Sequence, residues 1–581
     1  MRTEVQTALI KGFFFFTTHL LPRRPFKAMV KGIFHKPWKA FEAGTADPRG
    51  TQTRLLLDLV GAHAGPEFGK KHGFANVRSV DDYRAAVPVA GYDAFAPYIE
   101  KMMRGEKNVL VSDEVFYFAR TSGTTGRAKN VPVTQRYVDE FQRSQKVWYR
   151  QFALANPGMI KGNPLTIVSN KIEGHTEAGI PYGSISRALT FRENPAFDRV
   201  AVIPRGTFHI DDFNTKYYVL LRIALGTRIS TIAAVNPSTI MMFARKLNEF
   251  APRFIRDVRD GTLDRSVVID PALRARIEGQ LKPDRRRARE LERLLDRGGR
   301  LRPADAWPML CGLACWKGGA ADFYLRQFPS WYGDLPVLEF GFVASEGHFS
   351  VPLDARGNSG VFSVLSHFCE FAPLEEREAA PTDPFPRTLM AHELEAGRRY
   401  HIFISGSHGL YRYDINDIIE VTGFYKQTPL IRFVHKGGNM LSITGEKVGE
   451  SHIVTAVTTA AHDAGVPLDG FSVSIRLDET PRYVFAVEPS QTVGDDALRR
   501  LLSRCDEELG KANIEYETKR RSERLGGPVL LTLAPGAFER YRIRRVREGA
   551  PDAHVKPPHV FRTETELRSW LEVTRELNGE G

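Results

Sequence analysis

The chain has 581 residues, 42% of them hydrophobic and 26% charged. This length exceeds what one hydrophobic core supports, so two or more domains are expected, and the composition excludes collagen-like, coiled-coil and largely disordered chains. The formal net charge of +12 favours an anionic partner, but no basic patch is interleaved with aromatic residues. We therefore expect no nucleic-acid partner, whereas an anionic substrate agrees with the charge.

The chain contains four cysteines, none of them in a CxxC pair: Cys311, Cys315, Cys369 and Cys505. This spacing predicts neither a disulfide framework nor a structural zinc site. Free thiols are normal in a reducing compartment, so we expect a cytoplasmic protein. We also expect a monomer.

An apolar segment near the N-terminus, residues 8–21, contains four consecutive phenylalanines but is interrupted by Lys11 and His19. A membrane-spanning helix needs about 20 apolar residues, so no membrane span is expected. We expect instead a helix that docks on the protein's own core. Weak peripheral contact with a membrane is the second interpretation, and a cleaved signal peptide is the third.

Predicted helices and strands alternate through most of the chain. Residues 51–60 and 80–86 have helical patterns. Short apolar, β-branched runs predict strands at 115–119, 165–168, 200–203, 337–340 and 400–404. Because helical segments fall between many of these runs, we expect an α/β domain with sheets covered by helices.

The C-terminal part has a different pattern. Residues 470–476 and 483–487 predict a hairpin, and they are followed by one long amphipathic helix at 495–524, a strand at 529–533 and a basic helix at 538–547. This order is typical of a small α+β domain. The turn-prone residues at 434–439 suggest the boundary, which predicts a large domain of residues 1–434 and a small one of residues 435–581.

A loop of small residues follows the first predicted strand. Residues 121–129 read Thr-Ser-Gly-Thr-Thr-Gly-Arg-Ala-Lys. Glycines let the backbone approach an anion, and successive N–H groups, hydroxyls and a lysine can hold phosphates, although the spacing is not that of a Walker P-loop. A flexible surface loop is the alternative. The predicted phosphate-binding residues are Thr121, Ser122, Gly123, Thr124, Thr125, Gly126 and Lys129.

This loop resembles the phosphate loop of the adenylate-forming superfamily, which includes acyl-CoA synthetases, peptide-synthetase adenylation domains and luciferases. A second segment, residues 338–346, reads Leu-Glu-Phe-Gly-Phe-Val-Ala-Ser-Glu and ends in a carboxylate after an apolar strand. A carboxylate facing a triphosphate is a candidate Mg²⁺ ligand. The segment resembles the Tyr-Ala-Ser-Ser-Glu motif of the Gretchen Hagen family of acyl-acid amido synthetases, with Phe342 in place of the tyrosine.

The resemblance implies roles for single residues of these segments. Glu346 would be a catalytic residue and the Mg²⁺ ligand, Phe342 would stack on adenine, and Ala344 and Ser345 would contact the nucleotide. The turn at 316–319, Trp-Lys-Gly-Gly, is similar to the family's adenine-side turn and adds Gly318 and Gly319 to the nucleotide site.

A third segment, residues 409–417, reads Gly-Leu-Tyr-Arg-Tyr-Asp-Ile-Asn-Asp and resembles the family's Gly-Leu-Tyr-Arg-Tyr-Arg-Val-Gly-Asp. The resemblance implies that Asp417 binds the ribose hydroxyls and that Arg432 lies near the ribose. Asp414 and Asn416 depart from the pattern. Near the end of the chain, residues 554–560 resemble the segment that carries the family's catalytic lysine, which is Lys556 here.

Taken together, the resemblance covers the chain from about residue 50 to its end. It implies a large adenylate-forming domain with mixed sheets and a smaller, mobile α+β domain. It also implies an enzyme that uses ATP and Mg²⁺ to convert a small carboxylic acid to an acyl-adenylate and then transfers the acyl group to an amine, with an amino acid as the expected acceptor. The alternatives are an acyl-CoA synthetase, whose acceptor is a thiol, and an inactive homologue that binds a small molecule.

Overall fold

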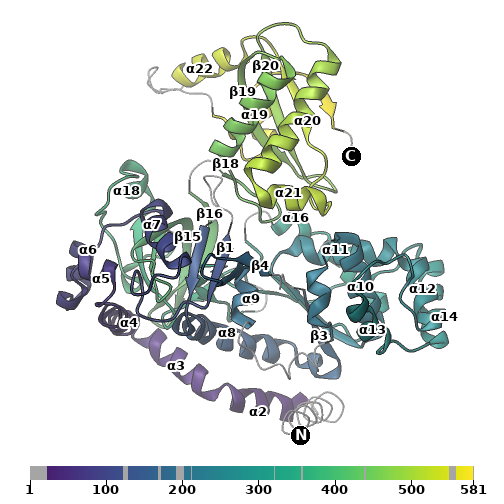
Figure 1. Cartoon of the computed structure of the whole chain (residues 1–581), viewed down its shortest axis with the longest axis horizontal. Coiled ribbons are helices and arrows are strands. Elements are labelled where there is room, and N and C mark those ends of the chain that lie inside the picture. Colours follow the sequence, from purple (N-terminus) through teal and green to yellow (C-terminus); the bar gives the residue numbers. More distant parts are fainter. Residues whose placement is uncertain are drawn as a thin grey trace. The chain divides into compact units, whose positions relative to one another are not determined.

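The computed structural model describes residues 23–121, 129–167, 172–190, 202–210, 212–318, 321–354, 357–437, 440–547 and 558–579. Residues 23–121 and 130–436 belong to one compact unit, and residues 437–579 form most of a second (Figure 1). The apolar segment at 8–21 lies outside the described residues, and no helix among the described residues is long and apolar enough to cross a membrane.

Three sheets and a short hairpin build the first unit. The first sheet has the order β2-β1-β5-β4 and contains β1 (Tyr117–Thr121), β2 (Lys129–Val133), β4 (Ile172–His175) and β5 (Pro181–Gly183). The second is parallel, with the order β3-β6-β7-β8, and contains β3 (Asn163–Ile167), β6 (Ile229–Ala234), β7 (Gly312–Cys315) and β8 (Val337–Glu339).

The third sheet is antiparallel and has six strands in the order β11-β12-β16-β15-β14-β13. Its strands are β11 (Ser350–Val351), β12 (Gly360–Phe362), β13 (Phe368–Pro373), β14 (Arg399–Ser405), β15 (Tyr413–Tyr425) and β16 (Thr428–Lys436). The hairpin consists of β9 (Val343–Ala344) and β10 (Gly347–His348), and it lies in the chain between the second and third sheets.

Helices cover these sheets, as Figure 1 shows. The helices of the N-terminal part are α2 (Arg23–Ile33), α3 (His35–Ala46), α4 (Pro48–Ala62), α5 (Glu67–Lys71), α6 (Val80–Ala86), α7 (Tyr92–Met103), α8 (Gln135–Ala155) and α9 (Ile185–Thr190). Those that follow are α10 (Phe213–Leu225), α11 (Pro237–Glu249), α12 (Ala251–Asp260), α13 (Pro271–Glu278), α14 (Arg285–Gly298), α15 (Pro303–Ala306), α16 (Ala321–Leu325), α17 (Phe328–Tyr332) and α18 (Leu374–Ala379).

Two large hydrophobic cores stabilise this unit. One lies among α4, α7, α8 and the six-stranded sheet, and includes Tyr117, Tyr137 and Tyr413. The other joins the parallel sheet to α10, α11 and α12, whose apolar residues are almost completely buried. Side-chain caps begin several helices; Thr134, for example, accepts a hydrogen bond from the backbone N–H of Tyr137 at the start of α8.

The second unit is an α+β domain. Its larger sheet has the order β19-β20-β21-β22 and contains β19 (Leu468–Arg476), β20 (Arg482–Pro489), β21 (Val529–Leu533) and β22 (Val573–Asn578). The remaining elements are the strands β17 (Met440–Leu441) and β18 (Val448–Gly449) and the helices α19 (Glu450–Ala464), α20 (Asp495–Ala512), α21 (Ile514–Arg521), α22 (Ala537–Arg547) and α23 (Glu564–Trp570). Helices α19 and α20 pack together in its core.

Most elements predicted from the sequence are confirmed, including the helix at 80–86, the strand at 529–533 and the C-terminal hairpin. Two predictions are wrong. Residues 202–203, the described part of the strand expected at 200–203, are not in a strand. The long helix expected at 495–524 ends at Ala512, because Asn513 leaves helical geometry at φ −141° and its side chain caps α21.

Candidate active site

The hairpin β9–β10 presents Ser345 and Glu346 as its two turn residues, since Ala344 pairs with Gly347. The phenol of Tyr137, from α8, donates a hydrogen bond of 2.6 Å to the backbone carbonyl of Ser345. The Glu346 residue is only 7% exposed. A buried carboxylate is thus held on a turn that is anchored from a distant helix.

Gly341 determines how the chain turns from β8 into this hairpin. Its φ is +90°, and an added Cβ would lie 2.0 Å from the carbonyl oxygen of Ser350. Only glycine fits both this conformation and this close approach of backbones. The N–H of the next residue, Phe342, donates to the hydroxyl of Ser350 at 2.9 Å.

Glu339, at the end of β8, is a site residue that the sequence reasoning missed. Its carboxylate accepts hydrogen bonds from the N–H of Lys317 at 2.6 Å and from the N–H of Gly341 at 3.0 Å. Burial raises the pKa of Glu339 to about 8. The carboxylate therefore joins the segments that follow the carboxyl ends of β7 and β8, and ligands of α/β proteins bind at such sheet edges. An acidic residue within an apolar strand is the signal that could have identified it.

Aromatic side chains surround this edge of the sheet. The ring of Phe433 lies 5.4 Å from that of Trp316 and 5.6 Å from that of Phe342, and Phe349 lies on another side of Phe342 at 4.9 Å. An added Cβ on Gly318 would lie 2.9 Å from the Trp316 indole, so the backbone runs close to that ring. Phe342 is 5% exposed, so in this structure it packs on protein rings.

Asp417 and Arg432 lie on neighbouring strands, β15 and β16. Asp417 is 3% exposed, and its Oδ1 accepts a hydrogen bond of 2.5 Å from the ammonium of Lys436, which also donates to the carbonyl of Ile415. Arg432 forms an ion pair of 2.9 Å with Glu420, the residue opposite it in the sheet. Both predicted ribose-side residues are therefore engaged in ion pairs with the protein itself.

Glu346 and Asp417 both lie within electrostatic range of Tyr413. Burial raises the pKa of Tyr413 well above its usual value, and the carboxylates of Glu346 and Asp417 are the next largest causes. Burial raises the pKa of Tyr92 to about 12, again with a contribution from Glu346. The hydroxyl of Tyr92 accepts a hydrogen bond of 2.7 Å from the N–H of Asn130, next to the predicted phosphate loop.

The ends of that loop are described, but most of it is not. Thr121 ends β1 and Lys129 begins β2, and these two strands are neighbours in one sheet. Seven predicted site residues lie outside the described residues: Ser122, Gly123, Thr124, Thr125, Gly126, Gly319 and Lys556. Their roles stay predictions.

The two departures from the family pattern have structural explanations. Asn416 has a φ of +59°, a conformation that glycine adopts freely and that asparagine tolerates better than most residues. The carboxylate of Asp414 accepts a hydrogen bond of 2.8 Å from the N–H of Asn416 and pairs with Arg377 at 3.1 Å. Both residues therefore help to fix the backbone of β15 just before Asp417.

Arg412, in the segment 409–417, stabilises the fold through contacts with other parts of the protein. Arg412 is 1% exposed, and its guanidinium pairs with the buried carboxylate of Glu370 at 2.9 Å. Its Nη1 donates to the carbonyls of Arg84 and Val87. The arginine thus connects the six-stranded sheet to the N-terminal helices.

The carboxylate of Glu346 could bind Mg²⁺ only together with the phosphates of a bound nucleotide. No group of three or more His, Cys, Asp or Glu side chains within the described ranges is arranged to hold a metal ion. Glu346 would therefore be the one carboxylate ligand, and phosphate oxygens and water would complete the coordination. This arrangement is usual for Mg²⁺, which binds through one or two carboxylates and substrate phosphates.

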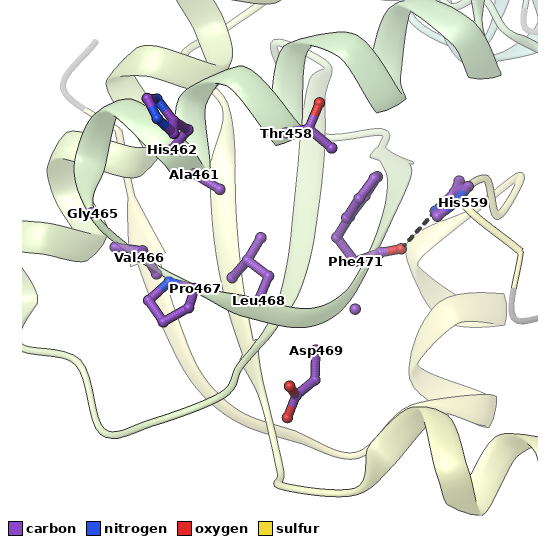
Figure 2. A pocket seen from close by; sticks show the side chains of 11 residues that line it. Thr458, Ala461, His462, Gly465, Val466, Pro467, Leu468, Asp469, Phe471 and His559 are labelled. Carbon is purple, nitrogen blue, oxygen red and sulfur yellow. Dashed lines mark hydrogen bonds between the residues drawn. The ribbon is translucent and has the colours of Figure 1, made fainter.

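In the second unit, the residues that follow position 556 are attached to β19. The hydroxyl of Ser472 donates to the carbonyl of Pro558 at 2.6 Å, and the N–H of Val473 donates to the carbonyl of His559 at 2.8 Å. The His559 ring stacks on Phe471 at 4.5 Å, at the edge of a surface pocket of about 510 Å³ (Figure 2). The segment that carries Lys556 is therefore held on its C-terminal side.

Comparison with known proteins agrees with this architecture along most of the chain. Three family models match: the GH3 family N-terminal domain at residues 38–337, the GH3 family central domain at 360–436 and the GH3 family C-terminal domain at 451–565. The second match ends at the same residue as β16.

Similar proteins include curated enzymes and a solved structure. The chain is 26% identical to indole-3-acetic acid-amido synthetase GH3.8 of Oryza sativa subsp. indica, over 93% of each chain. It is 23% identical to jasmonoyl--L-amino acid synthetase JAR4 of Nicotiana attenuata, over 89% of this chain and 92% of that one. Its fold is similar to that of GH3.15 acyl acid amido synthetase, with a TM-score of 0.62 and 20% identity over 93% of this chain and 96% of that chain.

Proposed function

The chain belongs to the GH3 family, and from this premise we propose that it is an ATP-dependent ligase that joins a small carboxylic acid to an amino acid. The observation that carries the proposal is that Glu346 and Asp417 are both buried in the first unit and both lie within electrostatic range of Tyr413. These are the two carboxylates expected at opposite ends of a bound ATP, one near the phosphates and the other near the ribose.

The first step that we propose needs no side-chain nucleophile. A carboxylate oxygen of the acid attacks the α-phosphorus of ATP, the bond from that phosphorus to the bridging oxygen breaks, and pyrophosphate leaves. Mg²⁺, when bound, neutralises charge on the phosphate oxygens. Glu346 would hold the ion, and the phosphate loop at 121–129 and Lys556 would add donors and positive charge where negative charge develops.

In the second step, the amine nitrogen of the amino acid attacks the acyl carbon, and the bond from that carbon to the AMP oxygen breaks. The products are an amide, AMP and a proton released from the amine. Asp417, Arg432 and the aromatic residues around Phe342 would keep the AMP portion in place through both steps. Small domains that move between steps commonly assemble such sites, and we propose that residues near Gly437 are the hinge.

The four cysteines are free thiols, which agrees with a reducing compartment, and we propose the cytoplasm as the location and a monomer as the active form.

The experiment that tests the function is ATP–pyrophosphate exchange with aryl, indolyl and aliphatic acids, followed by reactions of the active acids with amino acids or with CoA. We expect acid-dependent exchange, an amide product, and loss of exchange in Glu346→Ala and Lys556→Ala. Glu375→Ala, which changes a carboxylate that is 82% exposed, is the control and should retain exchange. A thioester without any amide would contradict the amide ligase, and acid-independent or absent exchange would favour an inactive homologue.

A further inference from the structure

A cavity of about 690 Å³ lies in the first unit, between the end of α10, the segment from α13 to α14, and the residues that follow α15. This volume is within the range of small-molecule sites in proteins. None of the residues that line it belongs to the candidate active site. The cavity therefore needs an explanation of its own.

Its place in the parallel sheet separates it from that active site. Ile229, which lines the cavity, is the first residue of β6, and Trp307 and Met309 line it just before β7 begins. The candidate active-site residues Trp316 and Glu339 lie at the opposite ends of β7 and β8. Because these strands are parallel, the cavity lies at their amino ends and the candidate active site lies at their carboxyl ends.

Positive charge predominates in the lining. Arg222, Arg228, Lys282 and Arg287 line the cavity with a single carboxylate, that of Asp284. Asp284 accepts a hydrogen bond of 2.8 Å from the N–H of Arg287 as the cap of α14. Arg287 is partly neutralised by Glu290 at 2.8 Å, whereas Lys282 is exposed and forms no ion pair with a described residue.

Arg222 is the most informative of these cations, because it is only 2% exposed. Its Nε donates to the carbonyl of Thr262 and its Nη2 to the carbonyl of Asp257, each at 2.9 Å. Its Nη1 has no hydrogen-bond partner among the described residues. Gly226 also lines the cavity, and a Cβ added to Gly226 would lie 3.9 Å from this Nη1 nitrogen. A buried guanidinium thus keeps a donor available beside the cavity.

Most of the other lining residues are apolar, and Thr227 and Gln280 are the polar exceptions. Ile277 is 1% exposed, and Val258 and Trp307 are each 2% exposed. Apolar walls favour an organic ligand, and arginine and lysine favour its carboxylate, sulfonate or phosphate group. We propose that this cavity binds a small organic anion with an apolar body, at a site separate from the adenylation site.

The test uses the full chain and two fluorescent probes, anilinonaphthalene sulfonate and its uncharged counterpart N-phenylnaphthylamine. The Arg228→Glu/Lys282→Glu variant should weaken sulfonate binding by about tenfold or more and change binding of the uncharged probe little. Gly226→Phe should weaken binding of both probes, since the backbone of Gly226 (φ −83°) suits any residue and the new ring would fill the cavity.

The control is Arg289→Glu/Arg293→Glu, which makes the same charge change on exposed residues of α14 that do not line the cavity. It should bind both probes as the unmodified chain does. Unchanged affinity in both cavity variants would overturn the proposal, as would an equal loss in the control. Displacement of the probe by ATP with no effect of the cavity variants would also overturn it, because it would assign the probe to the adenylation site.

Discussion

The ammonium of Lys436 lies 2.5 Å from Oδ1 of Asp417, so the last residue of the first unit neutralises the carboxylate expected to bind ribose. The two residues are opposite each other on β15 and β16. Asp417 is buried, and the side chain of its partner Lys436 is 18% exposed. The ion pair therefore links the strand that carries Asp417 to the chain segment where the two units meet in sequence.

We expect Lys436→Met to destabilise the first unit by about 2 kcal/mol, since it removes a charge-assisted hydrogen bond from a buried carboxylate. Urea denaturation followed by tryptophan fluorescence would measure this loss. Lys426→Met, which removes a half-exposed ion pair with Glu42, is the matched control and should cost less than about 1 kcal/mol. Equal losses in the two variants would contradict a special role for the Asp417 pair.

Tyr137 is expected to act as a positioning residue for the Ser345–Glu346 turn. In Tyr137→Phe the carbonyl of Ser345 loses its donor, so the turn should shift and the turnover rate of pyrophosphate exchange should fall about tenfold, with a smaller change in KM for the acid. Tyr83→Phe removes another buried hydrogen bond, to Ser405, far along the chain from this turn. It should cost similar stability, about 1 kcal/mol, without the loss of turnover, and parallel losses of turnover would argue against positioning.

Gly341→Ala should damage both folding and activity. The added Cβ would collide with the carbonyl of Ser350, and alanine is strained at a φ of +90°. We expect a loss of more than about 3 kcal/mol in urea denaturation, because backbone strain and a backbone clash add. Gly61→Ala, within α4 and with no atom near its Cβ, should instead stabilise the protein by up to about 1 kcal/mol. A neutral effect of Gly341→Ala would refute the close approach.

The raised pKa of Glu339 should make the free energy of unfolding depend on pH. Burial raises the pKa of its carboxyl from an ordinary 4.5 to about 8, so the folded state holds a proton that the unfolded state releases. Stability that is present at low pH is therefore lost as pH rises toward 8, with a slope of up to about 1.4 kcal/mol per pH unit. Burial lowers the pKa of His348 and His408 to about 4 and about 3, so these residues affect the slope below about pH 6.5.

The test for Glu339 is the urea midpoint between pH 6.5 and 8. The midpoint of the unmodified chain should fall over this range, and that of Glu339→Gln should stay nearly constant. Identical slopes in the two proteins would show that another group carries the effect.

Local patterns were enough to predict most elements and the order of the motifs. The apolar run at 529–533 predicts the buried strand β21, and the helical spacing at 80–86 predicts α6. The break at Asn513 was missed because an amphipathic pattern continues across it, and only the cap shows that two helices meet there.

The sequence by itself determined the family and the fold class, and it made Glu346 and Asp417 candidate site residues. Only the tertiary structure showed that Tyr137 anchors Ser345 from 208 positions away, that Lys436 forms an ion pair with Asp417, and that Arg222 lines a cavity. The physical reason is that motifs record which side chains a reaction needs, whereas hydrogen-bond partners, burial and pKa values depend on which distant segments pack together. The acidic residue in an apolar strand could have marked Glu339 as a candidate, but only the tertiary structure shows that its carboxylate is buried and that burial raises its pKa.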